Sequence, residues 1–417
     1  MKDVYLIGTS CTRFAKHPDK RFKQLTREAY EPVLADAGLA DGERIDTAWF
    51  SNVKMEMYGQ PNIRGQVCFS ELVAEGRFPA HAPMINVEGA CASGSLALHG
   101  AFKDIASGSA RCSLAIGVEK TYIPDDPERQ YQLFTGGLDQ LEPEVWHEYF
   151  RKAGEKMGRP WALNTGGGTL NMDTYAIQAA YHMQKYGTTQ KQFAIAAAKT
   201  HRFGSQNPLA QYQFEVSVDQ VIADREISFP LTRSMCAPIG DGAAAAILCS
   251  QDFLQSLPAV VRERAVRITG AALANGKYRS LDEPAVSHVA AKWAYAQAGI
   301  GPGHVDVAEV HDATTFGEIT QPENLGFCDP GQGGRFHESG ASDLGGSTPI
   351  NTSGGLVSKG HPVGATGLSM VYELTQQLRG EAGPRQVKDA HVALAENGGG
   401  TMGFDDAICA VTILQRA

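Results

Sequence analysis

The sequence predicts an α/β fold built from two similar halves, with a long insertion in the first half. Two observations carry this prediction. One succession of helix, glycine and strand occurs in both the amino-terminal and the carboxy-terminal parts of the chain, and one segment of the amino-terminal part has no counterpart in the other. Helices that alternate with strands in this way are typical of sheets covered by helices.

The first half opens with a buried-strand pattern over Val4 to Gly8. Apolar spacing predicts a helix over Thr26 to Asp36, which stops near Gly38 because glycine is a common helix end. Further strands are predicted over Thr47 to Val53 and over Ser113 to Val118.

The second half repeats this order. A helix is predicted over His288 to Gln297, with a stop at Gly299, and a strand over Val307 to Val310. A second helix is expected over Leu368 to Arg379, followed by a strand over His391 to Ala395. Each half therefore alternates helices and strands in the same sequence.

Two further matches make a chance resemblance between the halves less plausible. Cys91-Ala-Ser-Gly94 and Gly364-Ala-Thr-Gly367 each open a helix, and Asp241 and Asp406 each precede a similar apolar strand. A pseudo-twofold axis would bring the two helices together. We therefore expect Cys91 to lie opposite the loop before Gly364.

The predicted domains are a first half of residues 1–119 and 234–255, an inserted loop subdomain of residues 120–233, and a second half of residues 256–417. The insertion is rich in aromatic and polar residues, and helices are expected near 172–185 and 191–201. The residues that give it this character are Tyr131, Phe134, Trp146, His147, Tyr149, Phe150, Trp161 and 164–168. We interpret it as a substrate-binding lobe, or as a cap over a sheet edge or an oligomer interface.

Composition excludes several classes of protein. The chain has 417 residues, more than one compact core usually holds, and its net charge of −9 argues against a general nucleic-acid binder. No apolar segment has the length of a transmembrane helix, and the eight cysteines contain no CxxC pair. We therefore expect a cytoplasmic protein with free thiols, no zinc site and no affinity for membranes or nucleic acid.

Cys91 is the first candidate catalytic residue. It lies at a predicted corner between a strand and a helix, where unpaired N–H groups and the helix dipole favour a thiolate. Small residues surround it, including Gly89 and Gly94, and they leave the sulfur open to a ligand. Cys112, Cys249 and Cys409 instead occupy apolar runs that are typical of buried thiols.

The second half carries residues that complement Cys91. His311 follows a predicted strand, and His361 lies in a glycine-rich loop. A third segment, Glu396-Asn397-Gly398-Gly399-Gly400, follows another strand and can turn backbone N–H groups toward an oxyanion. Each signal alone has structural explanations, but together they predict a nucleophile, a base and an oxyanion site.

The segments GACASGS, EVHDA, NTSGG, KGHPVGATG and NGGGTMG, in this order, resemble the thiolase superfamily, in particular its sterol-carrier-type and archaeal-type branch. The resemblance spans essentially the whole chain. It implies an α/β thiolase fold with a duplicated, five-layered αβαβα architecture, in a homodimer or a dimer of dimers. It also implies coenzyme A as a substrate and no permanently bound cofactor.

The resemblance also implies roles for residues that match the family motifs. Cys91 would be the acylated nucleophile and His361 its activating partner. His311 would polarise the thioester oxygen of the substrate that forms the enolate. The backbone of Gly398, Gly399 and Gly400 would contribute to a second oxyanion hole together with the Cys91 N–H.

One departure from the family pattern concerns the proton on the α-carbon. Typical thiolases use a second cysteine, but here the corresponding segments read Glu396-Asn397-Gly and His311-Asp312-Ala313. Glu396 could replace that thiol if burial keeps it protonated, or its side chain could cap a turn. The sequence does not choose between these two interpretations.

Three functions are therefore considered. The first is a thiolase that cleaves or forms a bulky or aromatic 3-oxoacyl-CoA, with benzoylsuccinyl-CoA as the specific candidate. The second is a condensing enzyme of the ketoacyl-synthase kind, which would use the same Cys-His-His set. The third is a thiolase-like lyase or scaffold subunit that works with a small partner containing a zinc ribbon and an oligonucleotide-binding (OB) fold, a partner type that members of this branch often have.

Overall fold

The computed structural model describes residues 2–139, 142–156 and 169–417. One mixed sheet of nine strands runs through it, in the order β3-β2-β4-β7-β1-β8-β11-β10-β9. The strands are β1 (Val4–Cys11), β2 (Thr47–Ser51), β3 (Met84–Val87), β4 (Cys112–Glu119), β7 (Gly242–Ser250), β8 (Val266–Asn275), β9 (Val307–Glu309), β10 (Val392–Gly399) and β11 (Ile408–Arg416). A small hairpin of β5 (Glu226–Ser228) and β6 (Leu231–Thr232) forms a separate sheet.

The strand order repeats on either side of the contact between β1 and β8. Outward from that contact the first half places β1, β7, β4 and β2, and the second half places β8, β11, β10 and β9. The two halves join where Val4–Leu6 pair antiparallel with Val266–Ile268. The structure thus has the internal repeat that the sequence predicts, while β1 and β10 extend further than the predicted strands, to Cys11 and Gly399.

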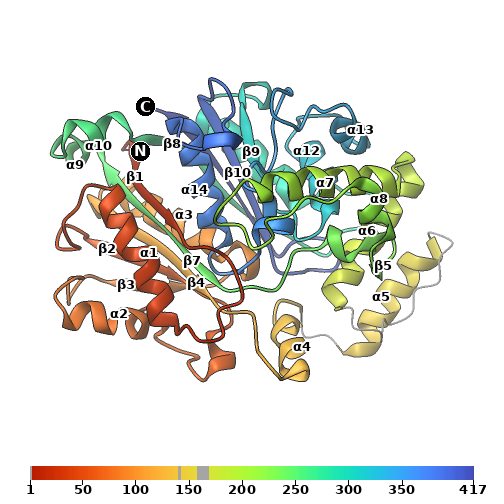
Figure 1. Ribbon diagram of the computed structural model, residues 1–417, viewed down its shortest axis with the longest axis horizontal. Helices are drawn as coiled ribbons and strands as arrows, with labels where there is room; N and C mark the ends of the chain where they lie inside the picture. The colour runs from red at the N-terminus through yellow and green to blue at the C-terminus, as the bar shows by residue number, and fades with distance from the viewer. Residues whose placement is uncertain (1, 140–141, 157–168) are drawn as a thin grey trace.

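The two halves of the sheet count as two layers, and helices lie between the halves and on the outer face of each half. The molecule therefore has five layers (Figure 1). The central helices α3 (Ser93–Ser107) and α14 (Thr366–Arg379) contact each other and strands of both halves. On the outer face of the first half lie α1 (Phe22–Asp36) and α2 (Arg64–Ala74). On that of the second half lies α11 (Val286–Ala298), and α12 (Thr315–Asn324) packs beside it. Three hydrophobic clusters fill the spaces between these layers.

The insertion forms a helical lobe at one side of the second half (Figure 1). Its helices are α4 (Pro127–Thr135), α5 (Pro143–Lys156), α6 (Leu170–Tyr186), α7 (Gln190–Ser205) and α8 (Val218–Ala223). α6 and α7 pack on α12, and Phe316 and Ile319 of α12 belong to the same hydrophobic cluster as residues of these two helices. Of the residues that give the insertion its aromatic and polar character, Trp161 and residues 164–168 lie outside the described part of the chain.

Aromatic side chains of α5 pack among themselves and on the second half. The Trp146 ring stacks on Phe150 with centroids 5.7 Å apart, and the Tyr149 ring stacks on Phe404 at 4.6 Å. Trp146, Phe150 and Phe404 are buried in one small cluster. These rings therefore attach the inserted lobe to the hairpin between β10 and β11.

The shorter elements complete the chain. They are the helices α9 (Gln251–Gln255), α10 (Ala259–Glu263) and α13 (Gly333–Glu338), the 3-10 turns at Met55–Tyr58, Ala90–Ala92, Arg233–Met235, Pro302–His304 and Gly383–Arg385, and a π-helical turn at Gly355–Lys359. Within the described ranges none of the helices has the combination of length and hydropathy that crossing a bilayer requires.

The first turns of α3 and α14 touch at two glycines. A Cβ atom on Gly94 would lie 3.0 Å from the Leu368 nitrogen, and one on Gly367 would lie 2.1 Å from the Ser95 hydroxyl. Only residues without a side chain allow the two helix starts to approach so closely. The expected meeting of the two helices is therefore confirmed.

We expect Gly367→Ala to lower the free energy of unfolding by about 1–3 kcal/mol, because its methyl group would overlap Ser95 in a packed interface. Urea denaturation of the purified proteins measures the loss. Gly301→Ala is the matched control, since that glycine has extended backbone and open space around its Cβ position. Equal stability of the two variants would contradict the close approach of the helices.

Candidate active site

Cys91 lies in a tight corner between β3 and α3. It is the middle residue of the 3-10 turn Ala90–Ala92, and Ala90 adopts a left-handed conformation with φ of 49°, which is rare for a residue other than glycine. The Ser93 hydroxyl accepts the Gly89 N–H at 2.9 Å and donates to the Ala90 carbonyl at 2.7 Å. This strained corner presents the sulfur to the second half.

His361 lies next to the sulfur. Its Nε2 atom is 3.1 Å from Cys91 Sγ, and its Nδ1 atom is 2.8 Å from the Thr366 hydroxyl. That hydroxyl donates to the Pro362 carbonyl at 3.2 Å, so it must accept the Nδ1–H of His361. The hydrogen-bond network therefore leaves Nε2 without a proton, ready to accept the proton of the Cys91 thiol.

His311, just after β9, holds its proton on the other ring nitrogen. The Ser95 hydroxyl donates to Asn397 Oδ1 at 2.9 Å, which turns Asn397 Nδ2 toward His311 Nδ1 at 3.1 Å. Because Nδ1 accepts, the proton sits on Nε2, which is buried and has no hydrogen-bond partner in the described structure. The His311 and His361 rings meet edge to face, with centroids 5.2 Å apart.

The structure thus brings together the three predicted side chains Cys91, His311 and His361, although they come from distant parts of the sequence. Their sulfur and one ring nitrogen of each histidine lie within 4.8 Å of one another. A thiolate and two imidazoles are also ligand types that zinc accepts, so the expectation of a chain without a zinc site stays a prediction.

Burial keeps the resting pair uncharged. It raises the pKa of Cys91 to about 12, with a further rise from the charge of Asp406, while Lys54 and the N–H groups of Gly400 and Cys91 oppose it. Burial, with the positive charge that His311 carries when it is protonated and with the charge of Lys359, holds the pKa of His361 well below its usual value. The N–H groups near Cys91 favour the thiolate, as the sequence predicts, but desolvation outweighs them and raises the pKa of the thiol.

Burial also lowers the pKa of His311 to about 4. The ring is neutral at physiological pH and offers its Nε2–H as an uncharged donor. A neutral donor suits an oxygen whose negative charge grows during a reaction.

The glycine-rich segment differs from the predicted loop. Residues 396–399 continue β10, where Gly398 pairs with Cys409 and Gly399 with Ile408 of β11. The turn begins only at Gly400, which has a φ of 69° and whose N–H is directed at the Cys91 sulfur. Of the three predicted oxyanion glycines, Gly400 thus presents its N–H to Cys91, whereas Gly398 and Gly399 form part of the sheet.

Gly399 still has a function that depends on its lack of a side chain. A Cβ atom there would lie 2.3 Å from the Gly89 carbonyl and 2.4 Å from the Ala92 nitrogen. The bare backbone lets β10 reach the Cys91 corner.

The two remaining candidates, Glu396 and Asn397, both form hydrogen bonds with His311. The Glu396 carboxylate accepts the His311 N–H at 3.0 Å and the Cys409 thiol at 3.2 Å, and burial raises its pKa to about 7. Asn397 accepts a hydrogen bond from the Ser95 hydroxyl and donates one to His311 Nδ1. Neither side chain lines the cavities described next, so both hold His311 in place.

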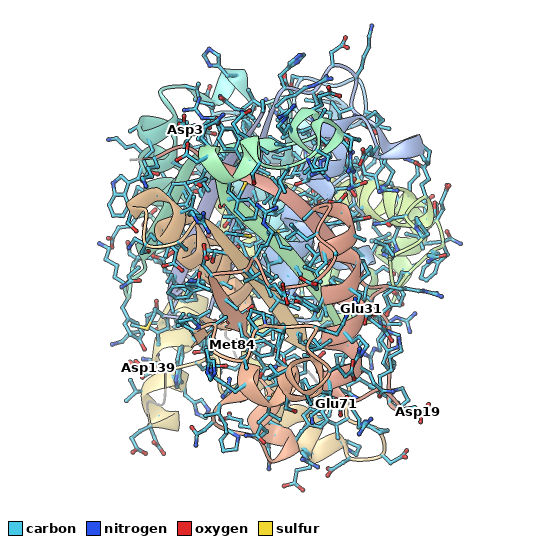
Figure 2. The ribbon with its side chains drawn as sticks, turned by 90° about the vertical axis from the view of Figure 1, so that its left-hand side faces the viewer. Asp3, Asp19, Glu31, Glu71, Met84 and Asp139 are labelled. Carbon is cyan, nitrogen blue, oxygen red and sulfur yellow. The ribbon has the colours of Figure 1, made fainter. Side chains whose placement is uncertain are left out.

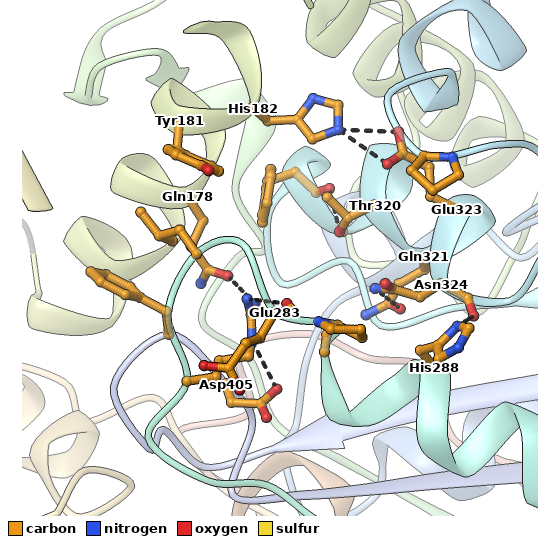
Figure 3. Close-up of a pocket in the computed structure, with 18 of the residues that line it drawn as sticks. Gln178, Tyr181, His182, Glu283, His288, Thr320, Gln321, Glu323, Asn324 and Asp405 are labelled. Carbon is orange, nitrogen blue, oxygen red and sulfur yellow. Dashed lines mark hydrogen bonds and ion pairs between the residues drawn. The ribbon is translucent and has the colours of Figure 1, made fainter. Parts of the chain in front are cut away.

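Two cavities meet around the site. The first, the sulfur cavity, has a volume of about 330 Å³ and is lined by Cys91 and His361. The second, the outer chamber (Figure 3), has a volume of about 510 Å³, and His311 is among the residues that line it. Tyr175 and Thr401 line both, so these two residues form the boundary between them.

Charge distinguishes the two cavities. Lys54, Arg225 and Arg233 line the sulfur cavity, and none of the described residues that line it carries a carboxylate. The outer chamber has a mainly acidic wall between α6, α11 and α12 (Figure 3). Its carboxylate residues are Asp282, Glu283, Glu323, Asp329, Asp405 and Asp406.

Sequence reasoning missed Lys54 and Tyr175, and it noted Asp406 only as part of the repeat. Lys54 follows a predicted strand without a motif, and Tyr175 is one of several aromatic residues in the insertion. Their positions in the cavities depend on how the inserted lobe packs on both halves. Asp406 could have been found from its position beside the glycine run.

Comparisons with known proteins agree with this geometry. The family model "Thiolase, N-terminal domain" matches residues 4–228, and "Thiolase C-terminal domain-like" matches residues 276–415. The chain therefore belongs to the thiolase family, and it is an acyltransferase with an α/β thiolase fold. The resemblance stated from the sequence motifs is confirmed.

Three curated relatives indicate the branch. The chain is 34% identical to an acetyl-CoA acetyltransferase of Methanothermobacter thermautotrophicus, over 97% of this chain and 98% of that protein. It is 35% identical to human sterol carrier protein 2, over 95% of this chain and 70% of that protein. It is 28% identical to the benzoylsuccinyl-CoA thiolase subunit BbsB of Thauera aromatica, over 96% and 95% of the two chains.

Among solved structures, one described as an Ltp2-ChsH2(DUF35) aldolase has a TM-score of 0.76 and 20% sequence identity, and the match covers 100% of this chain and 98% of that one. At this identity the likeness shows the shared fold.

We expect the rate at which iodoacetamide alkylates Cys91 to rise about tenfold per pH unit from pH 6 to pH 9, because only the small thiolate fraction of a thiol with a raised pKa reacts. Peptide mapping by mass spectrometry after short incubations measures the rate at Cys91 alone. A rate that is already constant at pH 7 would show a resting thiolate and would contradict the neutral pair.

Proposed function

We propose that this protein is a thiolase that cleaves or forms a 3-oxoacyl-CoA by passing an acyl group between Cys91 and coenzyme A. The observation that carries the proposal is the 3.1 Å contact between the Cys91 thiol and an unprotonated His361 nitrogen. A nucleophile and a base within hydrogen-bond distance form the basic unit of covalent catalysis. Family membership supplies the reaction class.

In the cleavage direction, His361 takes the thiol proton while the Cys91 sulfur attacks the 3-keto carbon. The N–H groups of Gly400 and Cys91, which point at the sulfur, are placed to stabilise the oxyanion that forms there. The bond between C2 and C3 then breaks, and its electron pair forms the enolate of the leaving thioester. The His311 Nε2–H is the donor for the enolate oxygen.

Coenzyme A completes the reaction. Its thiol attacks the acyl group on Cys91 and forms the second thioester, and the departing Cys91 sulfur recovers its proton from His361. Splitting the reaction through an acyl-enzyme replaces one difficult step by two easier ones.

Charge favours the sulfur cavity as the site of coenzyme A. This cofactor-like substrate carries phosphates, and the cavity lining includes three basic side chains without a described carboxylate. The exposed Arg225 side chain has no ion pair with any of the described residues and is suited to a phosphate at the mouth, while Lys54 is buried. The acidic outer chamber would repel the phosphates.

The size of the outer chamber supports a bulky acyl group. A volume of about 510 Å³ lies beyond His311, far more than an acetyl group fills. Benzoylsuccinyl-CoA is our specific candidate, in line with the resemblance to BbsB. The polar wall also suits acyl groups with hydrogen-bonding substituents.

Intact-protein mass spectrometry tests the proposal. We expect acetoacetyl-CoA or an aryl 3-oxoacyl-CoA to leave an acyl adduct on Cys91 that added CoA removes. Cys91→Ala should form no adduct and should lower cleavage by at least about a thousandfold, because the nucleophile is gone. Cys236→Ala, which changes the other cysteine of the same cavity, is the matched control for adduct position.

The other two functions give different results in the same experiment. Carbon–carbon cleavage that proceeds in Cys91→Ala without an adduct would replace the thiolase by a lyase. Decarboxylation of a malonyl thioester by the acylated protein would indicate a condensing enzyme. The test is run with and without any co-encoded small protein that contains a zinc ribbon and an OB fold, which we propose as a partner.

We further propose a homodimer formed through the β3 edge of the sheet. β3 pairs with β2 on one side, while the structure describes no strand on its other side. Figure 2 shows this side of the molecule, where Met84 is labelled, and Met84, Ile85 and Val87 are each partly exposed. An apolar edge strand readily pairs with a copy of itself.

Light scattering coupled to size-exclusion chromatography should give twice or four times the mass of the chain. Ile85→Lys, which places a charge on this edge, should shift the protein toward the monomer. Val289→Lys, at an exposed apolar position of α11, is the matched control and should leave the mass unchanged. A wild-type monomer would contradict the proposed interface.

A further inference from the structure

One proton in the proposed reaction has no obvious carrier. When the bond between C2 and C3 breaks, C2 holds an electron pair and must be protonated. His361 holds the proton of Cys91, and His311 donates a hydrogen bond to the enolate oxygen. The family cysteine that would serve C2 is absent, and Glu396 and Asn397 are occupied in holding His311.

Asp406 is a carboxyl group near the site that makes no such hydrogen bond to the described residues. It lines the outer chamber together with His311 and Tyr175. No described residue gives its carboxyl group a hydrogen bond or an ion pair, whereas Glu396 accepts two hydrogen bonds and the adjacent Asp405 accepts the Val286 N–H at 3.0 Å.

The glycine run of β10 makes room for Asp406. A Cβ atom on Gly398 would lie 2.3 Å from Asp406 Oδ2, so a side chain there would displace the carboxyl group. The next residue, Gly399, contacts the corner that holds Cys91. The same short run of backbone therefore lies between Asp406 and the nucleophile, and its glycines keep both close to the boundary of the two cavities.

The internal repeat provides a comparison. Asp241, the counterpart of Asp406 in the first half, accepts backbone N–H groups of Thr121, Tyr122 and His17 at 2.8 to 3.0 Å. Asp241 therefore fixes the backbone around it. Asp406 occupies the equivalent place before β11 without such contacts and faces the chamber.

We propose that Asp406 is the acid that protonates C2 of the leaving enolate. This inference rests on the proposed thiolase function. The electron pair of the broken bond takes the proton of the Asp406 carboxyl group, which leaves a carboxylate. That carboxylate then accepts the thiol proton of the incoming coenzyme A, so the acid is restored when the second thioester forms.

The electrostatics agree with this role. Burial, together with the charges of Glu396 and Asp405, raises the pKa of Asp406 well above its usual value. A raised pKa favours the protonated carboxyl group, which is the form that a general acid needs.

Two half-reactions test Asp406 separately from Cys91. Exchange of labelled CoA with an acyl-CoA forms no enolate, so it needs only His361 to move the thiol proton. Deuterium uptake from solvent at C2 of acetyl-CoA needs the Asp406 carboxylate to remove the C2 proton and to return a deuteron. We expect Asp406→Asn to keep the CoA exchange within about threefold and to lose at least about 100-fold in deuterium uptake and in cleavage. Asp219→Asn, the matched control at an exposed position of α8 away from both cavities, should keep both half-reactions.

A second variant distinguishes loss of the acid from misfolding of the protein. Asp406→Ala leaves space for a small acid, so added formate should restore part of the deuterium uptake. Unchanged uptake in Asp406→Asn would overturn the proposal, and so would equal loss of both half-reactions in a folded variant, which would give Asp406 a structural role. If the wild-type protein exchanges no CoA at all, the thiolase function itself fails.

Discussion

The close contact between the start of α14 and the first half is the constraint on which the site depends. The Ser51 hydroxyl donates to the Gly364 carbonyl at 2.8 Å, and the Glu119 carboxylate accepts the Gly364 N–H at 3.2 Å. A side chain on Gly117 would lie 2.1 Å from that carbonyl. Strands of the first half thus fix the loop that carries His361, which is why the imidazole reaches the Cys91 sulfur.

A second set of buried contacts fixes the position of His311 and of the chain segment that precedes His361. Asp312 accepts the N–H groups of Leu356 at 2.6 Å and of Val357 at 3.4 Å, and Glu309 accepts the Ser353 N–H at 3.0 Å. These carboxylates link the end of β9 to the π-helical turn before His361. Removing one partner of a buried charged network is usually costly, so this network makes the positions of the two histidines depend on each other.

Much of the architecture could be predicted because the chain repeats its own pattern. The repeat at Cys91-Ala-Ser-Gly94 and Gly364-Ala-Thr-Gly367 indicated that two helix starts meet, and they do. Cys91 and His361 could be selected because they lie beside glycine-rich corners, and His311 because it follows a predicted strand.

Other features could not be predicted because they depend on the environment in three dimensions. The thiol state of Cys91 reflects burial by distant segments, which the sequence pattern of a helix start does not contain. The extension of β10 through Gly399 arises from pairing with β11, which overrides the turn tendency of three glycines. The side-chain directions of Glu396 and Asn397 follow from this register.

A crystal structure of the Cys91→Ser variant with a bound 3-oxoacyl-CoA would test the account most directly. We expect the phosphates of coenzyme A near Arg225, the keto carbon about 3 to 3.5 Å from the hydroxyl at position 91, and the thioester oxygen within hydrogen-bond distance of His311 Nε2. Coenzyme A in the acidic outer chamber, or a keto carbon out of reach of position 91, would contradict it.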